Sequence, residues 1–201
     1  VVVNETPLFP VFSLAALDEA KWFYDKEKQL LYVCLKDRIA PDNQDIGVVA
    51  DSEYQDALLI NGANYVTIYG LTVRFAGGRG ISILGDYDVV EKCNVKFNGR
   101  SGINLFSYKD TSTTNVQIIR NHVFQNMMRN WPRGRYKWGA WGAGIGSNGT
   151  PSVSYEGNIV HNNGGEGLVV YGGKGGSIIK NNVVFNNWSV NIYVDNQANS
   201  I

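Results

Sequence analysis

The stretch VSYEGNIVHNNGGEGLVVY, residues 153–171, contains the pattern that decides the fold. A short alternating run is followed by a bend at Asn158, a second run that reaches Val160, and a glycine-rich turn into a third run. Alternation sends every second side chain of a strand to the same side. Three strands this short, joined by bends instead of helices, predict one triangular coil of a parallel β-solenoid.

The same pattern recurs in five copies from residue 58 onward. The other four copies are YVTIYGLTVRFAGGRGISIL (65–84), VVEKCNVKFNGRSGINLF (89–106), VQIIRNHVFQN with GAGIGS (116–126 and 142–147) and SIIKNNVVFNNWSVNIYVD (177–195). The valines of the second run are Val73, Val95, Val123, Val160 and Val184, spaced 22, 28, 37 and 24 residues apart. A β-sandwich would also have many short strands, but it does not require the same residue at each bend, so the repetition favours the solenoid.

Asparagines occupy two recurring positions around these valines. Two residues before them stand Leu71, Cys93, Asn121, Asn158 and Asn182, and three residues after four of them stand Asn98, Asn126, Asn163 and Asn187. Successive coils stack at about 4.8 Å, so equivalent residues form columns. We therefore expect these Asn side chains to point inward and to hydrogen-bond along the columns.

The repeats resemble the pectate-lyase-like superfamily of right-handed parallel β-helices. The resemblance rests on the I-x-x-N-x-V-x-x-N and G-I-x-I segments of residues 58–195. It implies an all-β, right-handed, single-stranded parallel β-helix and a secreted, extracellular or periplasmic, carbohydrate-active protein. The scaffold hosts lyases, hydrolases and non-catalytic fibres, so the activity stays open between a polysaccharide lyase, a glycoside hydrolase and a non-catalytic binding or structural module.

Two regions are expected: a cap at residues 1–57 and about five coils at residues 58–201. KWFYDKEKQLLYVCLKD (21–37) predicts a hairpin with its turn at Asp25–Lys28, and Ser13 is predicted to cap a short helix, SLAALDEA. This region is expected to cover the apolar end of the solenoid. At the other end, we expect further coils of a longer chain or a partner chain to cover the last turn.

The composition limits the classes of molecule that the protein is expected to bind. Lys+Arg and Asp+Glu both number 18, and no apolar run approaches a membrane span. These features argue against nucleic acid and membrane as partners, and the resemblance to carbohydrate-active β-helices implies a poly- or oligosaccharide instead. Cys34 and Cys93 have no metal-site spacing. They are interpreted as buried thiols, with a disulfide as the alternative.

An excursion at residues 127–141 interrupts the repeat and accounts for the 37-residue spacing. It has no acidic residue, and its cations and aromatics include Arg129, Trp131, Arg133, Arg135, Tyr136, Trp138 and Trp141. Aromatic rings stack on sugar rings, and Arg binds carboxylates in bidentate pairs. The excursion is thus predicted to overhang the glycine-containing strands and to bind sugar in a groove, with a uronate-containing chain as one option. The alternative is that its tryptophans pack on the coil.

The outward positions of the glycine-containing strands supply the other candidates. They are Ser82, Asn104, Gly146, Val169 and Tyr193, then Leu84, Phe106, Asn148, Tyr171 and Asp195, with Arg79 and Glu166 beside them. Arg79, Asn104 and Tyr193 are predicted to bind substrate.

Elimination from a uronate needs a base and a cation that stabilises the enolate. The resemblance to β-helix lyases implies Lys, Arg, His or Tyr for the first role and acidic Ca²⁺ ligands for the second. The matching residues are Lys109, Arg79, Tyr171 and Arg135 as base or clamp, and Asp86, Asp88 and Asp110 as ligands. A solvated turn is the alternative reading of the three aspartates.

Hydrolysis needs two carboxyl groups about 5 to 10 Å apart. Asp195 is the best single candidate, because Tyr-x-Asp strand ends resemble those of β-helix glycosidases. Glu166 lies one coil earlier, but five residues away along the strand direction. The two histidines, His122 and His161, are expected to point outward on another face, with Arg74 and Lys96 in the His161 column. That face is interpreted as solvated, with a histidine-based site as the alternative.

Overall fold

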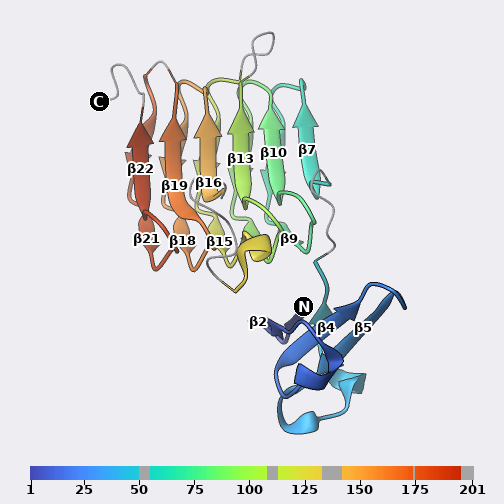
Figure 1. The fold of residues 1–201 in the computed structure, drawn as a ribbon. Helices are drawn as coiled ribbons and strands as arrows, with labels where there is room; N and C mark the ends of the chain where they lie inside the picture. Colours follow the sequence, from blue (N-terminus) through green and yellow to red (C-terminus); the bar gives the residue numbers. More distant parts are fainter. Residues whose placement is uncertain (50–54, 108–112, 133–141, 174, 196–201) are drawn as a thin grey trace. The chain divides into compact units, whose positions relative to one another are not determined.

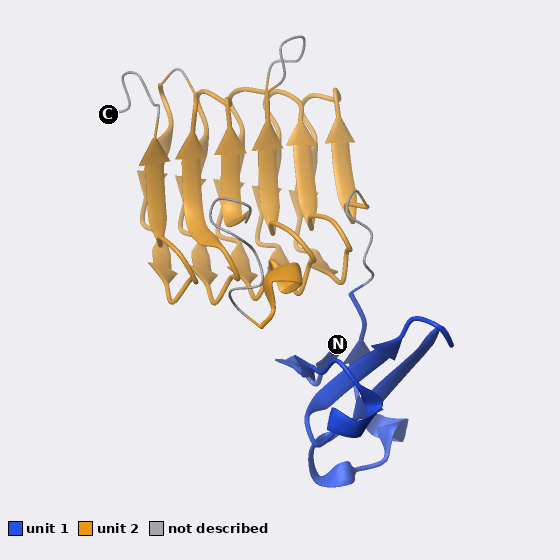
Figure 2. Cartoon of the chain, viewed as in Figure 1, with its two compact units in different colours: residues 1–49 blue, residues 50–201 orange. Residues whose placement is uncertain are grey.

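The computed structural model describes residues 1–49, 55–107, 113–132, 142–173 and 175–195. The chain divides into two compact units, residues 1–49 and 50–201, which are coloured separately in Figure 2.

The larger unit is a parallel β-solenoid whose strands form three sheets (Figure 1). The six-stranded sheet contains β7 (Leu58–Asn61), β10 (Ile81–Leu84), β13 (Ile103–Phe106), β16 (Ala143–Asn148), β19 (Glu166–Tyr171) and β22 (Ile192–Asp195). The β8 sheet contains β8 (Thr67–Tyr69), β11 (Val89–Glu91), β14 (Gln117–Ile119), β17 (Ser154–Glu156) and β20 (Ile178–Lys180). The β9 sheet contains β9 (Thr72–Arg74), β12 (Asn94–Lys96), β15 (His122–Phe124), β18 (Ile159–His161) and β21 (Val183–Phe185). The predicted fold class is confirmed.

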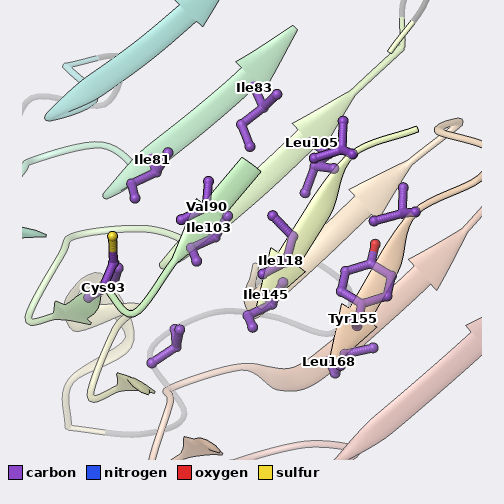
Figure 3. Close-up of a cluster of buried hydrophobic side chains, with 14 of the residues drawn as sticks. Ile81, Ile83, Val90, Cys93, Ile103, Leu105, Ile118, Ile145, Tyr155 and Leu168 are labelled. Atoms are coloured by element: carbon purple, nitrogen blue, oxygen red, sulfur yellow. The ribbon is translucent and has the colours of Figure 1, made fainter. Parts of the chain in front are cut away.

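Stacked columns of apolar side chains fill the interior (Figure 3). In the six-stranded sheet, Ile81, Ile103, Ile145 and Leu168 pair in register from strand to strand, and all four are fully buried. The five valines that define the repeat form a second column, through the pairs of the β9 sheet. Alternation in the sequence therefore identified the inward residues correctly.

Two asparagine ladders run along the solenoid, as predicted. One contains Asn121, Asn158 and Asn182, and the other contains Asn98, Asn126, Asn163 and Asn187. Each side-chain amide except that of the last Asn in each ladder donates to the Oδ1 of the Asn in the next coil at 2.9–3.1 Å. The same Oδ1 also accepts the backbone N–H of the Asn before it, as Asn163 Oδ1 does from Asn126 at 3.0 Å. The ladders satisfy backbone groups that the sharp bends would otherwise leave unpaired.

The second ladder also explains the glycine at or next to the start of four strands of the six-stranded sheet, β10, β13, β16 and β19. A Cβ at Gly102 would lie 2.5 Å from Val123 Cγ1 and 2.8 Å from Asn126 Nδ2. A Cβ at Gly144 would lie 2.6 Å from both Val160 Cγ1 and Asn163 Nδ2. The glycine of the Gly-apolar-x-apolar motif is therefore required, because the neighbouring column of Val and Asn side chains leaves no room for a Cβ.

The smaller unit contains short strands around a core of Val3, Leu8 and Leu35. Its elements are β1 (Val2–Val3), β2 (Thr6–Pro7), β3 (Phe9–Pro10), β4 (Lys21–Asp25), β5 (Leu30–Cys34) and β6 (Ile46–Gly47), with 3₁₀ turns at Leu14–Ala16, Lys36–Arg38 and Pro41–Asn43. β4 and β5 pair antiparallel, which confirms the predicted hairpin. The expected helix after Ser13 is reduced to the turn Leu14–Ala16, and the Ser13 side chain makes no capping hydrogen bond. That this unit covers the solenoid end stays a prediction.

Both cysteines are free thiols. Cys93 is buried, but it lies at the bend between β11 and β12 instead of within a strand, whereas Cys34 is only half-buried in β5.

Candidate functional site

The outward face of the six-stranded sheet brings most of the described candidates together. Val169 pairs with Tyr193, and Tyr171 pairs with both Asn148 and Asp195. Asn104 lies opposite Gly146 at the same face. The predicted register of both outward columns is therefore confirmed, because a period-two alternation fixes the face of every residue once one pair is known.

Tyr193 and Asp195 are in direct contact at the end of this face. The Tyr193 hydroxyl donates to Asp195 Oδ2 at 2.6 Å. This hydrogen bond to Asp195, together with the negative charges of Asp195 and Glu166, raises the pKa of Tyr193. A phenol is protonated at neutral pH even at its ordinary pKa, so Tyr193 carries a proton there, and the raised pKa makes it a weaker acid than a free phenol. Sequence reasoning named both residues but missed their contact, which their i, i+2 spacing on one face of a strand could have indicated.

Glu166 and Asp195 do not lie opposite each other. Asp195 pairs with Tyr171, whereas Glu166 stands at the beginning of β19, opposite Ala143 of β16. The five-residue offset corresponds to about 16 Å along the strand direction. This backbone separation exceeds the spacing of carboxyl groups in glycosidases, about 5 to 10 Å.

Arg79 is held by a residue that sequence reasoning did not single out. Asp56 Oδ1 accepts the Arg79 backbone N–H at 2.7 Å, and Asp56 Oδ2 lies 3.5 Å from the guanidinium. Ser82 Oγ donates to the same Oδ2 at 2.5 Å, and the guanidinium stacks over the Phe106 ring at 4.5 Å. Asp56 thus orients Arg79 on the outward face. No repeat signal marks Asp56, because it precedes the first strand.

The excursion is anchored at the turn that leads into the six-stranded sheet. The 3₁₀ turn η4 spans Met128–Asn130, and the buried Asn130 side chain donates to Gly164 O at 2.6 Å. Met127 donates its N–H to Arg100 O at 2.8 Å, and Gly142, where the described chain resumes, contacts the Met127 sulfur. Arg129 and Trp131 therefore lie at the entry to this sheet.

Several predicted residues lie outside the described part of the chain. They are Lys109, Asp110, Arg133, Arg135, Tyr136, Trp138 and Trp141. Their roles, and the overhang of the excursion, stay predictions.

Asp86 and Asp88 both accept backbone hydrogen bonds from neighbouring coils. Asp86 Oδ1 accepts the Thr114 N–H and Asp88 Oδ1 accepts the Val66 N–H, both at 2.8 Å. Burial, together with the charge of Asp86, raises the pKa of Asp88, although the Val66 hydrogen bond opposes this. Within the described ranges, no three His, Cys, Asp or Glu side chains are grouped so that they could hold a metal ion. The predicted Ca²⁺ role of the two aspartates stays a prediction.

The two histidines meet on the outward face of the β9 sheet. Their Nε2 atoms are 2.8 Å apart. Lys96 pairs with Phe124 and Phe124 with His161, so the predicted column of Arg74, Lys96 and His161 is correct. The contact with His122, which belongs to the neighbouring column, was not predicted.

Comparison with known proteins identifies a family for most of the chain. The model of a family described as "Right handed beta helix region" matches residues 56–201. No curated protein and no solved structure matches the chain. In the described part of the chain, no helix has both the length and the apolar character needed to cross a membrane.

Proposed function

The chain belongs to the right-handed β-helix family, and on that premise we propose that it binds a polysaccharide on the outward face of the six-stranded sheet and cleaves it there. The partner is an oligo- or polysaccharide, and the protein acts outside the cytoplasm, extracellularly or in the periplasm. Nucleic acid and membrane are not part of the proposal.

The contact between Tyr193 and Asp195 carries the proposal. A protonated phenol next to a carboxylate offers a proton donor and a fixed negative charge within one hydrogen bond. Both hydrolysis and elimination require a proton for the departing glycosidic oxygen. Tyr193 supplies that proton and takes one back from the attacking water in hydrolysis, or from the carbon next to the uronate carboxyl group in elimination, and Asp195 orients the phenol.

The neighbouring side chains suit sugar binding. Asn104 and the exposed Asn148 present amides toward hydroxyl groups, and Tyr171 presents a half-exposed ring to the C–H face of a sugar. Trp131 and Arg129 stand at the entry to the sheet, where η4 anchors the cation-rich excursion. Bidentate contacts from arginine would select a uronate-containing chain.

A panel of polygalacturonate, alginate and xylan tests cleavage. New ultraviolet absorbance reports elimination, and new reducing ends without that absorbance report hydrolysis. Tyr193→Phe keeps the ring but removes the hydroxyl, so we expect the rate to fall by about 100-fold or more. Tyr69→Phe, on the outward face of the β8 sheet, should leave the rate unchanged. Absence of both products with the unmodified chain excludes cleavage of these substrates.

A non-catalytic binding module is the second candidate, and one observation favours it. Glu166 and Asp195 are offset by about 16 Å along the strand direction, so these two carboxyl groups do not form a hydrolase pair. Retention of one of the polysaccharides on an affinity gel, with no product in either assay, distinguishes this function from cleavage.

A further inference from the structure

His122 and His161 connect two successive coils of the solenoid. His122 opens β15 in the third coil and His161 closes β18 in the fourth, and these strands are neighbours in the β9 sheet. The Nε2 atoms are 2.8 Å apart and the ring centroids 5.0 Å apart. A ring nitrogen lies about 1.1 Å from its ring centre, so the two nitrogens point almost directly at each other.

This geometry accommodates one proton between the rings. A neutral imidazole has one donor nitrogen and one acceptor nitrogen. At 2.8 Å, one Nε2 donates and the other accepts. If both rings were protonated on both nitrogens, two N–H groups and two positive charges would face each other.

The surroundings of the pair disfavour a second positive charge. Phe124 stacks on His122 with centroids 4.3 Å apart and on His161 at 5.2 Å, and Phe185 stacks on the other side of His161 at 4.8 Å. The Nδ1 atom of His161 is buried and has no hydrogen-bond partner. A charged His161 ring would therefore have to lose most of its hydration.

The charged groups that face the pair from the neighbouring strands are cationic. Lys96 of β12 lies over the Phe124 ring at 5.5 Å, and Arg74 of β9 continues the same column. β18 and β21 contribute only apolar neighbours, Ile159, Val183 and Phe185. The outward positions of the described β9-sheet strands contain no carboxylate to neutralise a second proton. Burial first, and then the charge of Lys96, lowers the pKa of His122, whereas burial and His122 lower that of His161.

We propose that His122 and His161 form an acid-sensitive contact that holds the third coil to the fourth while they share one proton and opens when a second proton binds. The contact lies near the hydrogen bond between Asn126 and Asn163 in the second asparagine ladder. His122 is four residues before Asn126, and His161 is two residues before Asn163. Asn126 is followed directly by Met127 and η4, which anchor the excursion. Acid therefore loosens the solenoid where the excursion begins. This inference does not depend on the proposed function.

Nuclear magnetic resonance can read the pair without interference, because the chain has only two histidines. The imidazole ¹⁵N and ¹³C shifts are followed from pH 8 to pH 4 in the presence of EDTA. We expect two protonation steps, both below the ordinary value of about 6.5 and separated by one pH unit or more. Two independent, overlapping titrations near 6.5 would overturn the proposal.

His161→Phe provides a second test, because it keeps a ring in the Phe124–Phe185 stack while removing the nitrogen that faces His122. Between pH 7.5 and pH 5, the urea concentration at the midpoint of unfolding should decrease more for the unmodified chain than for the variant. The lowered pKa of each histidine means that the unfolded chain binds protons first as the pH falls, so acid favours unfolding. An equal loss of midpoint in both proteins contradicts the proposal, and the titration of the unmodified chain decides it if the variant fails to fold.

Discussion

Asn163 Nδ2 donates a hydrogen bond to Asn187 Oδ1 at 2.9 Å, one coil further along the solenoid. Its own Oδ1 accepts from Asn126 Nδ2 at 3.1 Å, one coil before. Asn163 is fully buried, so each of these groups would be unpaired without the ladder. The ladder thus joins three coils through one side chain.

Replacing the central member of the ladder should weaken the fold strongly. Asn163→Ala leaves the Asn126 N–H and the Val123 carbonyl without their partners. We expect a loss of about 3 kcal/mol in the free energy of unfolding, measured with urea. Gln117→Ala, at an exposed position of β14, is the control and should cost less than about 0.5 kcal/mol. Similar losses in both variants would remove the structural role given to the ladder.

Cys93 continues the column of Asn121, Asn158 and Asn182, and an asparagine at this position should stabilise the fold more than cysteine does. Its sulfur contacts Ile68 O and Glu91 O at 3.7 and 3.4 Å, and its N–H donates to Asn121 Oδ1. The Asn182 amide, three coils further along the same column, uses the equivalent carbonyls, Tyr155 O and Lys180 O. Cys93→Asn replaces a weak S–H donor with two amide donors, so the melting temperature should rise. Cys93→Ser is the comparison, and an equal or lower melting temperature for the Asn variant would contradict this reading.

Two glycines on the same strand should respond differently to alanine. A Cβ at Gly144 overlaps Val160 Cγ1 and Asn163 Nδ2 at 2.6 Å, whereas a Cβ at Gly146 meets nothing nearer than 3.4 Å. Gly144→Ala should therefore cost about 3 kcal/mol or prevent folding, and Gly146→Ala should cost less than about 1 kcal/mol. Chemical unfolding monitored by tryptophan fluorescence compares them. A tolerated Gly144→Ala would mean that the column beside the ladder is less tightly packed than the structure indicates.

The glycines and asparagines also show why the fold could be predicted from the sequence. Each coil must pass the same steric and hydrogen-bonding constraints, so Gly102 and Gly144, or Asn126 and Asn163, recur at matching positions. Because each coil stacks on its neighbours, a local pattern that recurs in every coil predicts the structure of the whole solenoid. The short turn at Leu14–Ala16, which was expected to be a helix, has no such repetition to support it.

Contacts between columns are harder to predict. Two such contacts are those between His122 and His161 and between Asp56 and Arg79. They depend on side-chain rotamers and on diagonal neighbours. A periodic pattern specifies which face a residue occupies, but not which neighbour its side chain reaches. The Tyr193–Asp195 pair is intermediate, because i, i+2 spacing already places both residues on one face.

Asp88 should limit stability at neutral pH. Its Oδ2 atom is buried without a hydrogen-bond partner, and its raised pKa means that the folded chain binds a proton more readily than the unfolded chain. Stability therefore falls as the pH rises through the window between the ordinary and the raised pKa. Asp88→Asn keeps an oxygen for the Val66 N–H and removes the charge, so we expect a gain of about 1 kcal/mol at pH 7.

The same comparison at acidic pH supplies the control. Near pH 3, Asp88 is neutral in the folded chain, and the Asn variant should lose most of its advantage. Urea unfolding in the presence of EDTA measures both conditions. An equal advantage at pH 3 and pH 7 would show that charge burial is not the cause.

The most direct test of the account is whether a polysaccharide contacts the outward face of the six-stranded sheet. Tyr171 of β19 is 40% exposed on that face, and Tyr69 of β8 is 54% exposed on another. Affinity electrophoresis of Tyr171→Ala and Tyr69→Ala in gels containing polygalacturonate, alginate or xylan compares the two surfaces. We predict that the unmodified chain is retarded by at least one of these polysaccharides, that Tyr171→Ala weakens this binding by about tenfold, and that Tyr69→Ala does not. Binding that is lost only in Tyr69→Ala, or no retardation of the unmodified chain in any gel, would contradict the account.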